Sequence, residues 1–219
     1  MELRHNVITE KTQLNGDTYR FVIAEGGSAF NSPGQLIRVH SLKGNGKKLI
    51  PVVEFDSNRY IIVFRADDEV GKELAALESG DNFAAELGIG NGFDIDAIPD
   101  ECVIAGEGIG IATMLGVLRR ILMLGKESKV VLCYESVEEM FLLREFIKLT
   151  ATLDILTIDG SNGRQGHIDS AIFGEDYVCA WADDEVLENA AHKVKRGQFA
   201  SLMHFDGEGP VYDKTAFEQ

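Results

Sequence analysis

The strongest chemical signal in the sequence is a glycine-rich corner between an apolar run and a helical pattern. It reads Val103-Ile104-Ala105-Gly106-Glu107-Gly108-Ile109-Gly110-Ile111-Ala112. Glycine allows a sharp turn and lets a pyrophosphate approach the backbone without meeting a Cβ atom, and the helix that follows offers free N–H groups to the anion. Gly106, Gly108, Ile109 and Gly110 are therefore candidate ligands of a dinucleotide diphosphate. A tight turn that serves only packing is the alternative.

Two carboxylates bear on this candidate site. Glu107 stands inside the corner, where it opposes a bound diphosphate unless its side chain points away. Glu135 follows the next apolar strand, where it could hydrogen-bond a ribose hydroxyl and would repel a 2′-phosphate, favouring NADH over NADPH. A solvated residue at a strand end explains Glu135 equally well.

A parallel sheet is needed to hold these residues, and the second half of the chain alternates strand and helix patterns. The predicted strands are Cys102–Ala105, Val130–Tyr134, Leu153–Ile158 and Tyr177–Ala180, and the predicted helices are Ile111–Leu124, Val137–Lys148 and Glu185–Lys195. We expect Ser136 and Glu139 to form a capping box on the second helix, and Gly197 to close the third. This alternation predicts right-handed crossovers and a parallel sheet.

The first half of the chain reads instead as short strands divided by turn signals. The candidates are Asn6–Thr9, Thr18–Ile23, Leu36–His40, Leu49–Phe55, Tyr60–Phe64 and Phe83–Leu87, with one helix at Gly71–Leu77. Strands of this length and spacing predict an antiparallel sandwich or a closed Greek-key barrel. We therefore divide the chain into an all-β antiparallel barrel, residues 1–97, and an α/β Rossmann-like parallel-sheet domain, residues 98–219, with the boundary near Asp94–Asp100.

Charge and composition narrow the classes of partner. The 36 acidic and 21 basic residues give a formal net charge of −15. Such a field repels phosphate backbones and anionic lipid, so we expect neither nucleic acid nor a membrane as partner. The charge serves solubility, or it complements a basic or cofactor-bearing protein. No apolar run reaches the roughly 20 residues that span a bilayer, and residues 1–9 lack the apolar segment of a secretory signal.

The cysteines indicate a reducing compartment and no metal centre. Cys102, Cys133 and Cys179 are the three cysteines of the chain, and each stands in an apolar, strand-like run. We expect buried free thiols and a cytoplasmic protein. No pair has the spacing of metal ligands.

Several motifs, in chain order, resemble the ferredoxin–NADP⁺ reductase superfamily, and within it the electron-transfer subunits of two-component dihydroorotate dehydrogenases. They are Ser32-Pro33-Gly34-Gln35-Leu36, Ile61-Ile62-Val63-Phe64-Arg65, Ser79-Gly80-Asp81, Gly90-Asn91-Gly92-Phe93, Gly106–Ala112 and Asp159-Gly160-Ser161-Asn162-Gly163 through Gly166. The resemblance implies a barrel that binds FAD and a second domain that binds NAD(P)H, with hydride transfer in the cleft between them. In the family, electrons then leave through a [2Fe–2S] cluster to a partner flavoprotein.

The resemblance also implies where the cofactors would bind. The flavin site falls on Pro51, Val52, Val53, Phe64, Arg65 and Gly71, and the nicotinamide site on the glycine corner with Glu135, Asp159 and Cys179. The family's Arg-Pro pair, followed by a small residue and Ser, reads Ile50-Pro51-Val52-Val53 here, so the arginine and the hydroxyl are missing. Its Gly-Thr phosphate contact falls on Val70-Gly71. Arg65 can supply a positive charge for the flavin phosphates, whereas we expect Lys43, Lys47 and Lys48 to be solvated loop residues.

Two further departures concern the nicotinamide and the cluster. Where the family has Cys-Gly-Pro, this chain has Cys179-Ala180-Trp181, whose ring could stack on a flavin, block the nicotinamide pocket or pack in the core. Where the family has four closely spaced cysteines after a Ser-Leu pair, Ser201-Leu202 is followed by Met203–Pro210 without a cysteine. An ordinary [2Fe–2S] centre needs four thiolates, so we expect no cluster.

Two functions are compatible with the sequence. The first is an NAD(P)H-linked flavoprotein that passes electrons through FAD to a partner protein, such as a flavoprotein or another redox subunit, or to a small acceptor. The second is a cofactor-poor relic subunit that acts as a structural or regulatory interaction module. The glycine corner and the Asp159–Gly166 loop favour the first, and the eroded motifs favour the second. We assign no catalytic side chain, interpret His40 and His167 as non-catalytic, and leave a homo-oligomer open.

Overall fold

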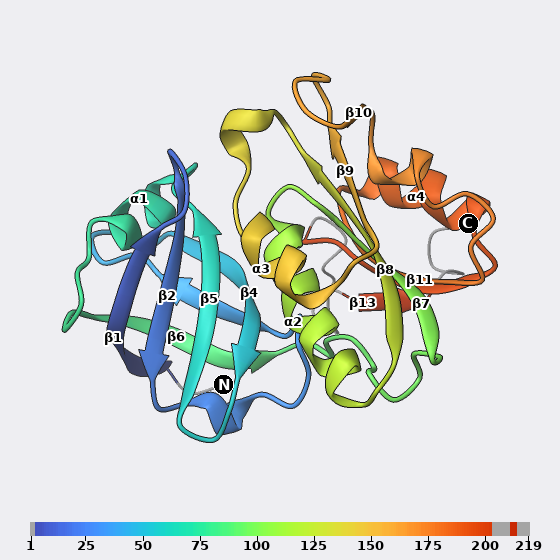
Figure 1. The fold of residues 1–219 in the computed structure, drawn as a ribbon. Coiled ribbons are helices and arrows are strands. Elements are labelled where there is room, and N and C mark those ends of the chain that lie inside the picture. The colour runs from blue at the N-terminus through green and yellow to red at the C-terminus, as the bar shows by residue number, and fades with distance from the viewer. Residues whose placement is uncertain (1–2, 203–210, 214–219) are drawn as a thin grey trace.

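Two sheets with different strand arrangements lie side by side in the computed structural model, which describes residues 3–202 and 211–213 (Figure 1). The first is a closed antiparallel barrel in the order β1-β2-β5-β4-β3-β6. Its strands are β1 (Leu3–Gln13), β2 (Thr18–Ala24), β3 (Leu36–His40), β4 (Lys47–Phe55), β5 (Arg59–Arg65) and β6 (Asn82–Ile89). Closure leaves no free edge, and it confirms the predicted antiparallel barrel.

Alternating side chains fill the barrel. Phe21, Phe64 and Phe83 are all but fully buried, and the rings of Phe21 and Phe64 meet edge to face with centroids 5.0 Å apart. The predicted helix forms as α1 (Glu69–Ala75), which begins two residues earlier than expected because Asp68 caps it. Asp is among the preferred N-cap residues since its carboxylate accepts the free N–H groups of the first turn.

The second sheet has seven strands in the order β10-β9-β8-β7-β11-β12-β13. Its strands are β7 (Glu101–Glu107), β8 (Glu127–Tyr134), β9 (Leu153–Thr157), β10 (Arg164–Gln165), β11 (Tyr177–Trp181), β12 (Arg196–Ala200) and β13 (Val211–Asp213). All neighbours are parallel except β12 and β13. This arrangement confirms the predicted Rossmann-like domain, to which the structure adds β10, β12 and β13.

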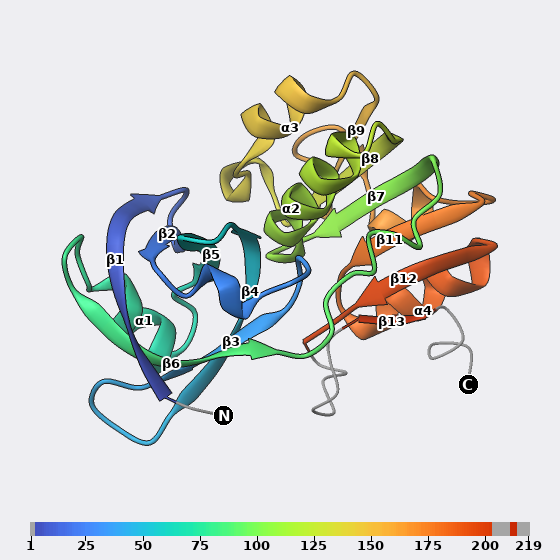
Figure 2. The same ribbon diagram turned by 90° about the horizontal axis from the view of Figure 1, so that it is seen from below.

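Helices cover both faces of this sheet. The helices α2 (Gly110–Met123) and α3 (Leu143–Leu149) lie on the face toward the barrel, and α4 (Asp184–Lys193) lies on the opposite face (Figure 2). Successive residues of a strand point to opposite faces. Accordingly, Ile104 packs in the core with α2, whereas Val103 packs in the core with α4.

The predicted helix Val137–Lys148 is wrong as a continuous element. A short 3-10 helix, Val137–Glu139, is followed by an extended segment, and Leu142 (φ 56°) adopts the left-handed conformation just before α3. The Ser136 side chain makes no capping bond, so the predicted capping box is absent as well. The Tyr134 hydroxyl donates to the Phe141 carbonyl at 2.9 Å, and a tertiary contact of this kind replaces the helical bond that the pattern predicted.

Gly197 was also assigned to the wrong role. It lies inside β12 rather than after α4, and a Cβ atom there would stand 2.4 Å from the Val178 carbonyl oxygen of β11. Gly197 therefore allows two strands to approach closely and does not cap a helix.

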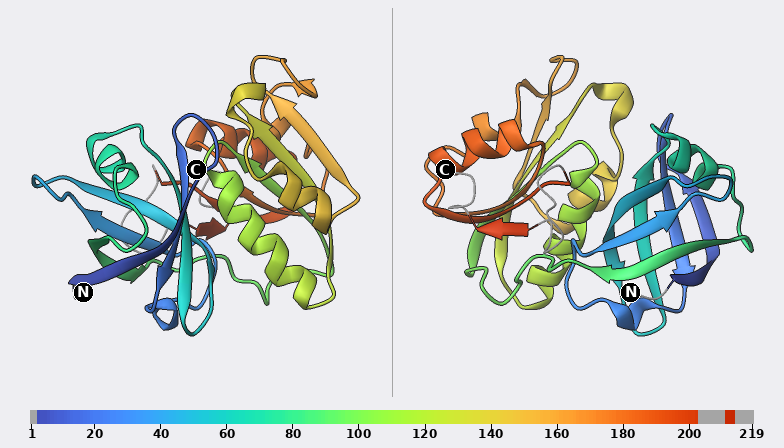
Figure 3. Two further views of the ribbon diagram at one scale, coloured as in Figure 1. Left: turned by 60° about the vertical axis from the view of Figure 1, so that its left-hand side comes forward. Right: turned by 180° about the vertical axis from the view of Figure 1, so that it is seen from behind.

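One helix joins the barrel to the second sheet. In α2, a Cβ atom at Gly116 would stand 1.8 Å from the Val53 carbonyl oxygen of β4, so the helix backbone lies directly on the barrel (Figure 3). The same hydrophobic core contains Leu36, Val53, Val63 and Ile89 of the barrel together with the apolar side of α2. The predicted boundary, Asp94–Asp100, falls in the connection between β6 and β7. None of the helices within the described ranges is long and apolar enough to cross a bilayer.

Candidate functional site

The glycine corner lies at the carboxyl end of β7, in the middle of the parallel sheet. This edge is where open α/β sheets bind their ligands. Gly108 (φ +55°) has nothing within 4 Å of an added Cβ atom, so the space in front of it is open. At Gly106, a Cβ atom would stand 2.9 Å from Ile111 Cα. Gly106 therefore serves the close packing of strand and helix, and Gly108 presents open backbone.

Trp181 occupies the space that a side chain at Gly110 would need. A Cβ atom at Gly110 would stand 2.5 Å from Trp181 Cδ1, and the Trp181 residue is only 3% exposed. The Trp181 ring also lies beside Phe93, with centroids 6.4 Å apart. Of the three interpretations of Trp181, core packing is the one that the structure shows. The ring holds the start of α2 in place from the buried side.

Glu107 points away from the front of the corner. Its carboxylate is bonded to His167 Nδ1 at 2.6 Å and accepts from the Ile168 N–H at 3.2 Å, on the face that α4 covers. The hydrogen bond with Glu107 raises the pKa of His167, whose side chain is 44% exposed. The conflict between Glu107 and a bound diphosphate is thereby relieved, because a histidine 60 positions along the chain takes up the carboxylate.

Glu135 and Asp159 are brought together at the ends of β8 and β9. The Asp159 N–H donates to the Glu135 carbonyl at 3.2 Å, and both residues are exposed. Asp159 Oδ1 accepts from the Ser161 hydroxyl at 2.7 Å and from the Ser161 N–H at 2.9 Å. These bonds, led by that of the Ser161 hydroxyl, lower the pKa of Asp159. The two acidic residues are therefore neighbours along the backbone at the ends of adjacent strands, and β8 adjoins the strand that carries the glycine corner.

Cys179 lies in the middle of its strand and not next to the strand end that the predicted range Tyr177–Ala180 implied. The strand β11 continues to Trp181, and Cys179 pairs with Ile104 on one side and Gln198 on the other. The Cys179 thiol is completely buried, and this burial raises its pKa well above the ordinary value. All three thiols are buried and unpaired, as the sequence predicted.

A cavity of about 370 Å³ lies where the barrel meets the glycine corner, and we call it the junction pocket. It is lined by Lys47, Lys48, Leu49, Ile50, Pro51, Val63, Phe64, Arg65, Asp67, Asp68, Ile109 and Leu202. The structure thus brings Pro51, Phe64 and Arg65 together with Ile109 of the corner. The other predicted flavin residues lie elsewhere: Val52 and Val53 are buried in hydrophobic cores, and Gly71 lies within α1.

Arg65 carries the least satisfied charge of the junction pocket. Its Nε is buried and has no hydrogen-bond partner among the described residues, and its Nη2 reaches Glu139 Oε2 only at 3.9 Å. Buried donors of this kind are rare in folded proteins. An acceptor on a bound ligand would satisfy it.

Lys47 and Lys48 belong to β4 and not to a loop, which corrects the expectation from the sequence. Lys48 Nζ binds Asp67 Oδ1 at 2.6 Å and Asp68 Oδ2 at 2.8 Å, and its side chain is only 14% exposed. Lys48 is therefore neutralised inside the protein rather than solvated. Lys43 is exposed between β3 and β4, as expected.

Asp68 also accepts the hydrogen bond of the Gly71 N–H, which the resemblance assigns to a phosphate contact. Its Oδ1 accepts from the Gly71 N–H at 2.6 Å, which is the capping bond of α1. A Cβ atom at Gly71 would stand 2.4 Å from the Arg65 carbonyl oxygen, so this glycine serves close packing. An aspartate immediately before a helical pattern is a cap signal, and it could have identified this role from the sequence.

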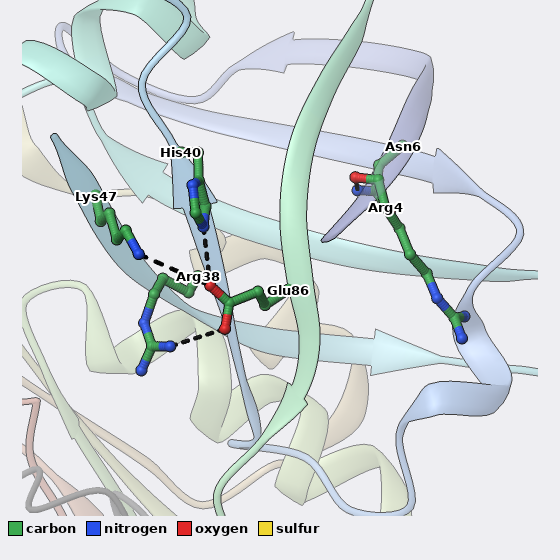
Figure 4. A network of polar contacts seen from close by, with 6 residues as sticks. All are labelled: Arg4, Asn6, Arg38, His40, Lys47 and Glu86. Carbon is green, nitrogen blue, oxygen red and sulfur yellow. Dashed lines mark hydrogen bonds and ion pairs between the residues drawn. The ribbon is translucent and has the colours of Figure 1, made fainter. Parts of the chain in front are cut away.

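His40 belongs to a separate ionic network on the outer face of the barrel. Glu86 is bonded to Arg38 Nη1 and to His40 Nε2, each at 2.9 Å, and lies 4.0 Å from Lys47 Nζ (Figure 4). The bond with His40, together with the nearby cations, lowers the pKa of Glu86. His40 is held by Glu86 and does not line the junction pocket.

Comparison with known proteins agrees with this architecture. No protein-family model matches the chain. It is 24% identical over 167 residues to the electron transfer subunit of dihydroorotate dehydrogenase B (NAD(+)) from Listeria innocua, covering 74% of this chain and 65% of that protein. It is 26% identical over 180 residues to the same subunit from Fusobacterium nucleatum, covering 78% and 69%. The chain thus spans about two thirds of the length of these curated relatives.

Solved structures share the fold. A chain of an NADH-dependent reduced ferredoxin–NADP oxidoreductase superimposes with a TM-score of 0.79 at 18% identity, covering 96% of this chain and 88% of that one. A ferredoxin–NADP⁺ reductase from Neisseria gonorrhoeae gives a TM-score of 0.71 at 15% identity, covering 96% and 97%. The resemblance to ferredoxin–NADP⁺ reductases and to the electron-transfer subunits, inferred from the motifs, is confirmed.

Proposed function

We propose that this chain is an NAD(P)H-linked flavoprotein that passes electrons to a partner protein or a small acceptor without an iron–sulfur cluster. One observation carries the proposal: Ile109 belongs both to the glycine corner and to the junction pocket. A nucleotide held at the corner and a ring held in the pocket would therefore be neighbours. A flavin, when bound, supplies the chemistry, since it accepts a hydride and releases electrons.

The residues of the chain would bind and orient these groups. The open backbone at Gly108, with the N-terminus of α2 behind it, suits a diphosphate. The apolar side chains of Leu49, Pro51 and Leu202 suit the face of an aromatic ring and keep water from it. Arg65 suits an anionic group of the ligand.

Electrons would leave without a cluster. The segment Met203–Pro210 carries no cysteine and lies outside the described residues, and no group of metal ligands occurs within the described ones. The acceptor would then have to reach the flavin itself. The named relatives are electron-transfer subunits, which supports a protein acceptor. Buried, unpaired thiols suit the cytoplasmic setting predicted from the sequence.

The neighbouring carboxylates favour NADH as the donor. Glu135 and Asp159 stand at the strand ends where a ribose would lie beside a diphosphate on the corner. A 2′-phosphate there would meet two negative charges. We therefore expect NADH to bind more tightly than NADPH, and neutralising both carboxylates to reduce this preference.

Absorbance and a nucleotide titration test the proposal. Purified protein, or protein incubated with flavin, should show flavin bands that bleach with NADH. Gly108→Trp should fill the open space at the corner and weaken NADH binding by about tenfold or more, with the barrel still folded. Gly125→Trp is the matched control, because Gly125 also combines a positive φ with open space and follows the opposite end of α2 from the corner. Equal NADH affinity of the Gly108 variant and the control would refute the diphosphate assignment.

The charges of the junction pocket also support the second function, a relic subunit without redox cofactors. Asp67 and Asp68 place negative charge where the resemblance leads one to expect phosphate, and this favours a relic subunit that serves only protein contact. A protein that takes up neither flavin nor NADH would support this alternative.

A further inference from the structure

The charges of the junction pocket suit a smaller anion than a diphosphate. Its lining holds the cations Lys47, Lys48 and Arg65 and the carboxylates Asp67 and Asp68, which leaves one more cation than carboxylate. Lys48 is engaged by both carboxylates, and Lys47 belongs to the Glu86 network (Figure 4). Arg65 also lies 3.9 Å from Glu139 Oε2, but its Nε is buried and has no hydrogen-bond partner among the described residues, which makes it the pocket cation with a donor left for a ligand.

The two carboxylates occupy the route that a second phosphate would need. Asp68 fills the anion position at the start of α1, because its carboxylate accepts the Gly71 N–H. Asp67 stands beside it and is more than half exposed toward solvent. A like charge brought against such groups is disfavoured. Ile50 of β4 stands where the family has its arginine, which leaves Arg65 as the arginine that lines the pocket.

We infer that the junction pocket binds flavin mononucleotide in preference to FAD, with Arg65 as the cation for its single phosphate and with Asp67 and Asp68 excluding a second phosphate. This inference rests on the proposed function, which requires a flavin but not a particular one. It differs from the FAD that the family resemblance implies. The pocket volume lies near the lower end of the range for small-molecule sites, which suits the ring system and one phosphate.

Flavin titrations of the full chain test this inference directly. The protein is freed of any bound flavin, and the quenching of flavin fluorescence is followed with riboflavin, FMN and FAD. We expect FMN to bind most tightly and FAD to bind about tenfold or more weakly than FMN. FAD binding as tightly as FMN, or more tightly, would overturn the inference and leave the proposed function standing. Saturable binding of none of the three would overturn both.

Variants separate the two halves of the inference. Arg65→Gln should weaken FMN by about tenfold and leave riboflavin unchanged, because riboflavin has no phosphate. Asp67→Asn should strengthen FAD relative to FMN. Glu69→Gln is the matched control, since it removes the same charge from an exposed residue that does not line the pocket. Equal effects of Arg65→Gln on FMN and riboflavin, or of Asp67→Asn and Glu69→Gln on FAD, would contradict the inference.

Discussion

The contact between Glu107 and His167 determines where the one acidic side chain of the glycine corner points. The sequence revealed the conflict between Glu107 and a diphosphate but not its outcome. Residues 103, 105 and 107 must share one face of their strand, yet only the packing of α4 on that face determines that it points away from the barrel. The partner, His167, follows a glycine with φ +134° in a distant loop. No periodic pattern links the two positions.

The Glu107–His167 pair makes the free energy of unfolding depend on pH. The pKa of His167 is raised in the folded protein, chiefly by its hydrogen bond with Glu107. The stability that this pair contributes is therefore complete below the ordinary histidine pKa of about 6.5 and is lost as the pH rises through the raised value. Because the imidazole is nearly half exposed, the contribution should be about 1 kcal/mol or less.

Histidine titration by NMR measures this effect. Glu107→Gln should lower the pKa of His167 toward the ordinary value and should flatten the decline in unfolding free energy above pH 6.5. His167→Gln should abolish the same decline. A pKa of His167 that is unchanged by Glu107→Gln would show that the contact does not persist in solution.

At the scale of elements, local patterns predicted the positions of most strands and of α1, α2 and α4, but not the elements that depend on contacts with other parts of the chain. The strand β12 contains Arg196, Gly197 and Gln198 and has no apolar alternation, so its pairing with β11 determines its structure. The region after Ser136 has a helical pattern but breaks at Leu142 because the Phe141 carbonyl bonds to Tyr134. The junction pocket, likewise, is formed by β4, β5 and a corner that lies far along the chain.

The contact between the start of α2 and Trp181 can be tested by adding one methyl group at Gly110. Gly110→Ala places a Cβ atom 2.5 Å from the indole, so the helix or the ring must shift. Overpacking of this kind costs about 1–3 kcal/mol. Trp181 is the single tryptophan of the chain, so its fluorescence reports the shift directly. We expect a lower unfolding free energy, an altered emission maximum and weaker NADH binding.

Gly16→Ala serves as the control for this substitution, because nothing lies within 4 Å of the added atom. It should leave both the emission and the NADH affinity as they are in the wild type. An unaltered emission spectrum of Gly110→Ala would mean that Trp181 does not support the corner.

At the scale of the whole molecule, the two sheets that the sequence separates share the hydrophobic core that lies between them. Barrel residues such as Leu36 and Val63 belong to the same cluster as Ile104 of β7 and Leu118 of α2. Arg119 of α2 and Glu54 of β4 add an ion pair across the joint. The change in rhythm along the chain showed that there are two architectures. It could not show how firmly they are joined, because the contact depends on Gly116, and nothing in the sequence distinguishes this glycine from other positions of the helix.

This joint predicts a single cooperative unfolding transition for the wild-type chain. Gly116→Val forces side-chain atoms into the space that the Val53 carbonyl occupies, only 1.8 Å from the position of the new Cβ atom. The helix must then move away from β4, at a cost of about 3 kcal/mol or more. Far-UV circular dichroism, which follows both sheets, should coincide with Trp181 fluorescence in the wild type. In the variant the Trp181 transition should separate from the barrel transition, whereas Gly16→Val should keep them coincident. Coincident transitions in Gly116→Val would show that the halves cooperate through contacts other than this one. In that case the junction pocket would not depend on the seating of α2.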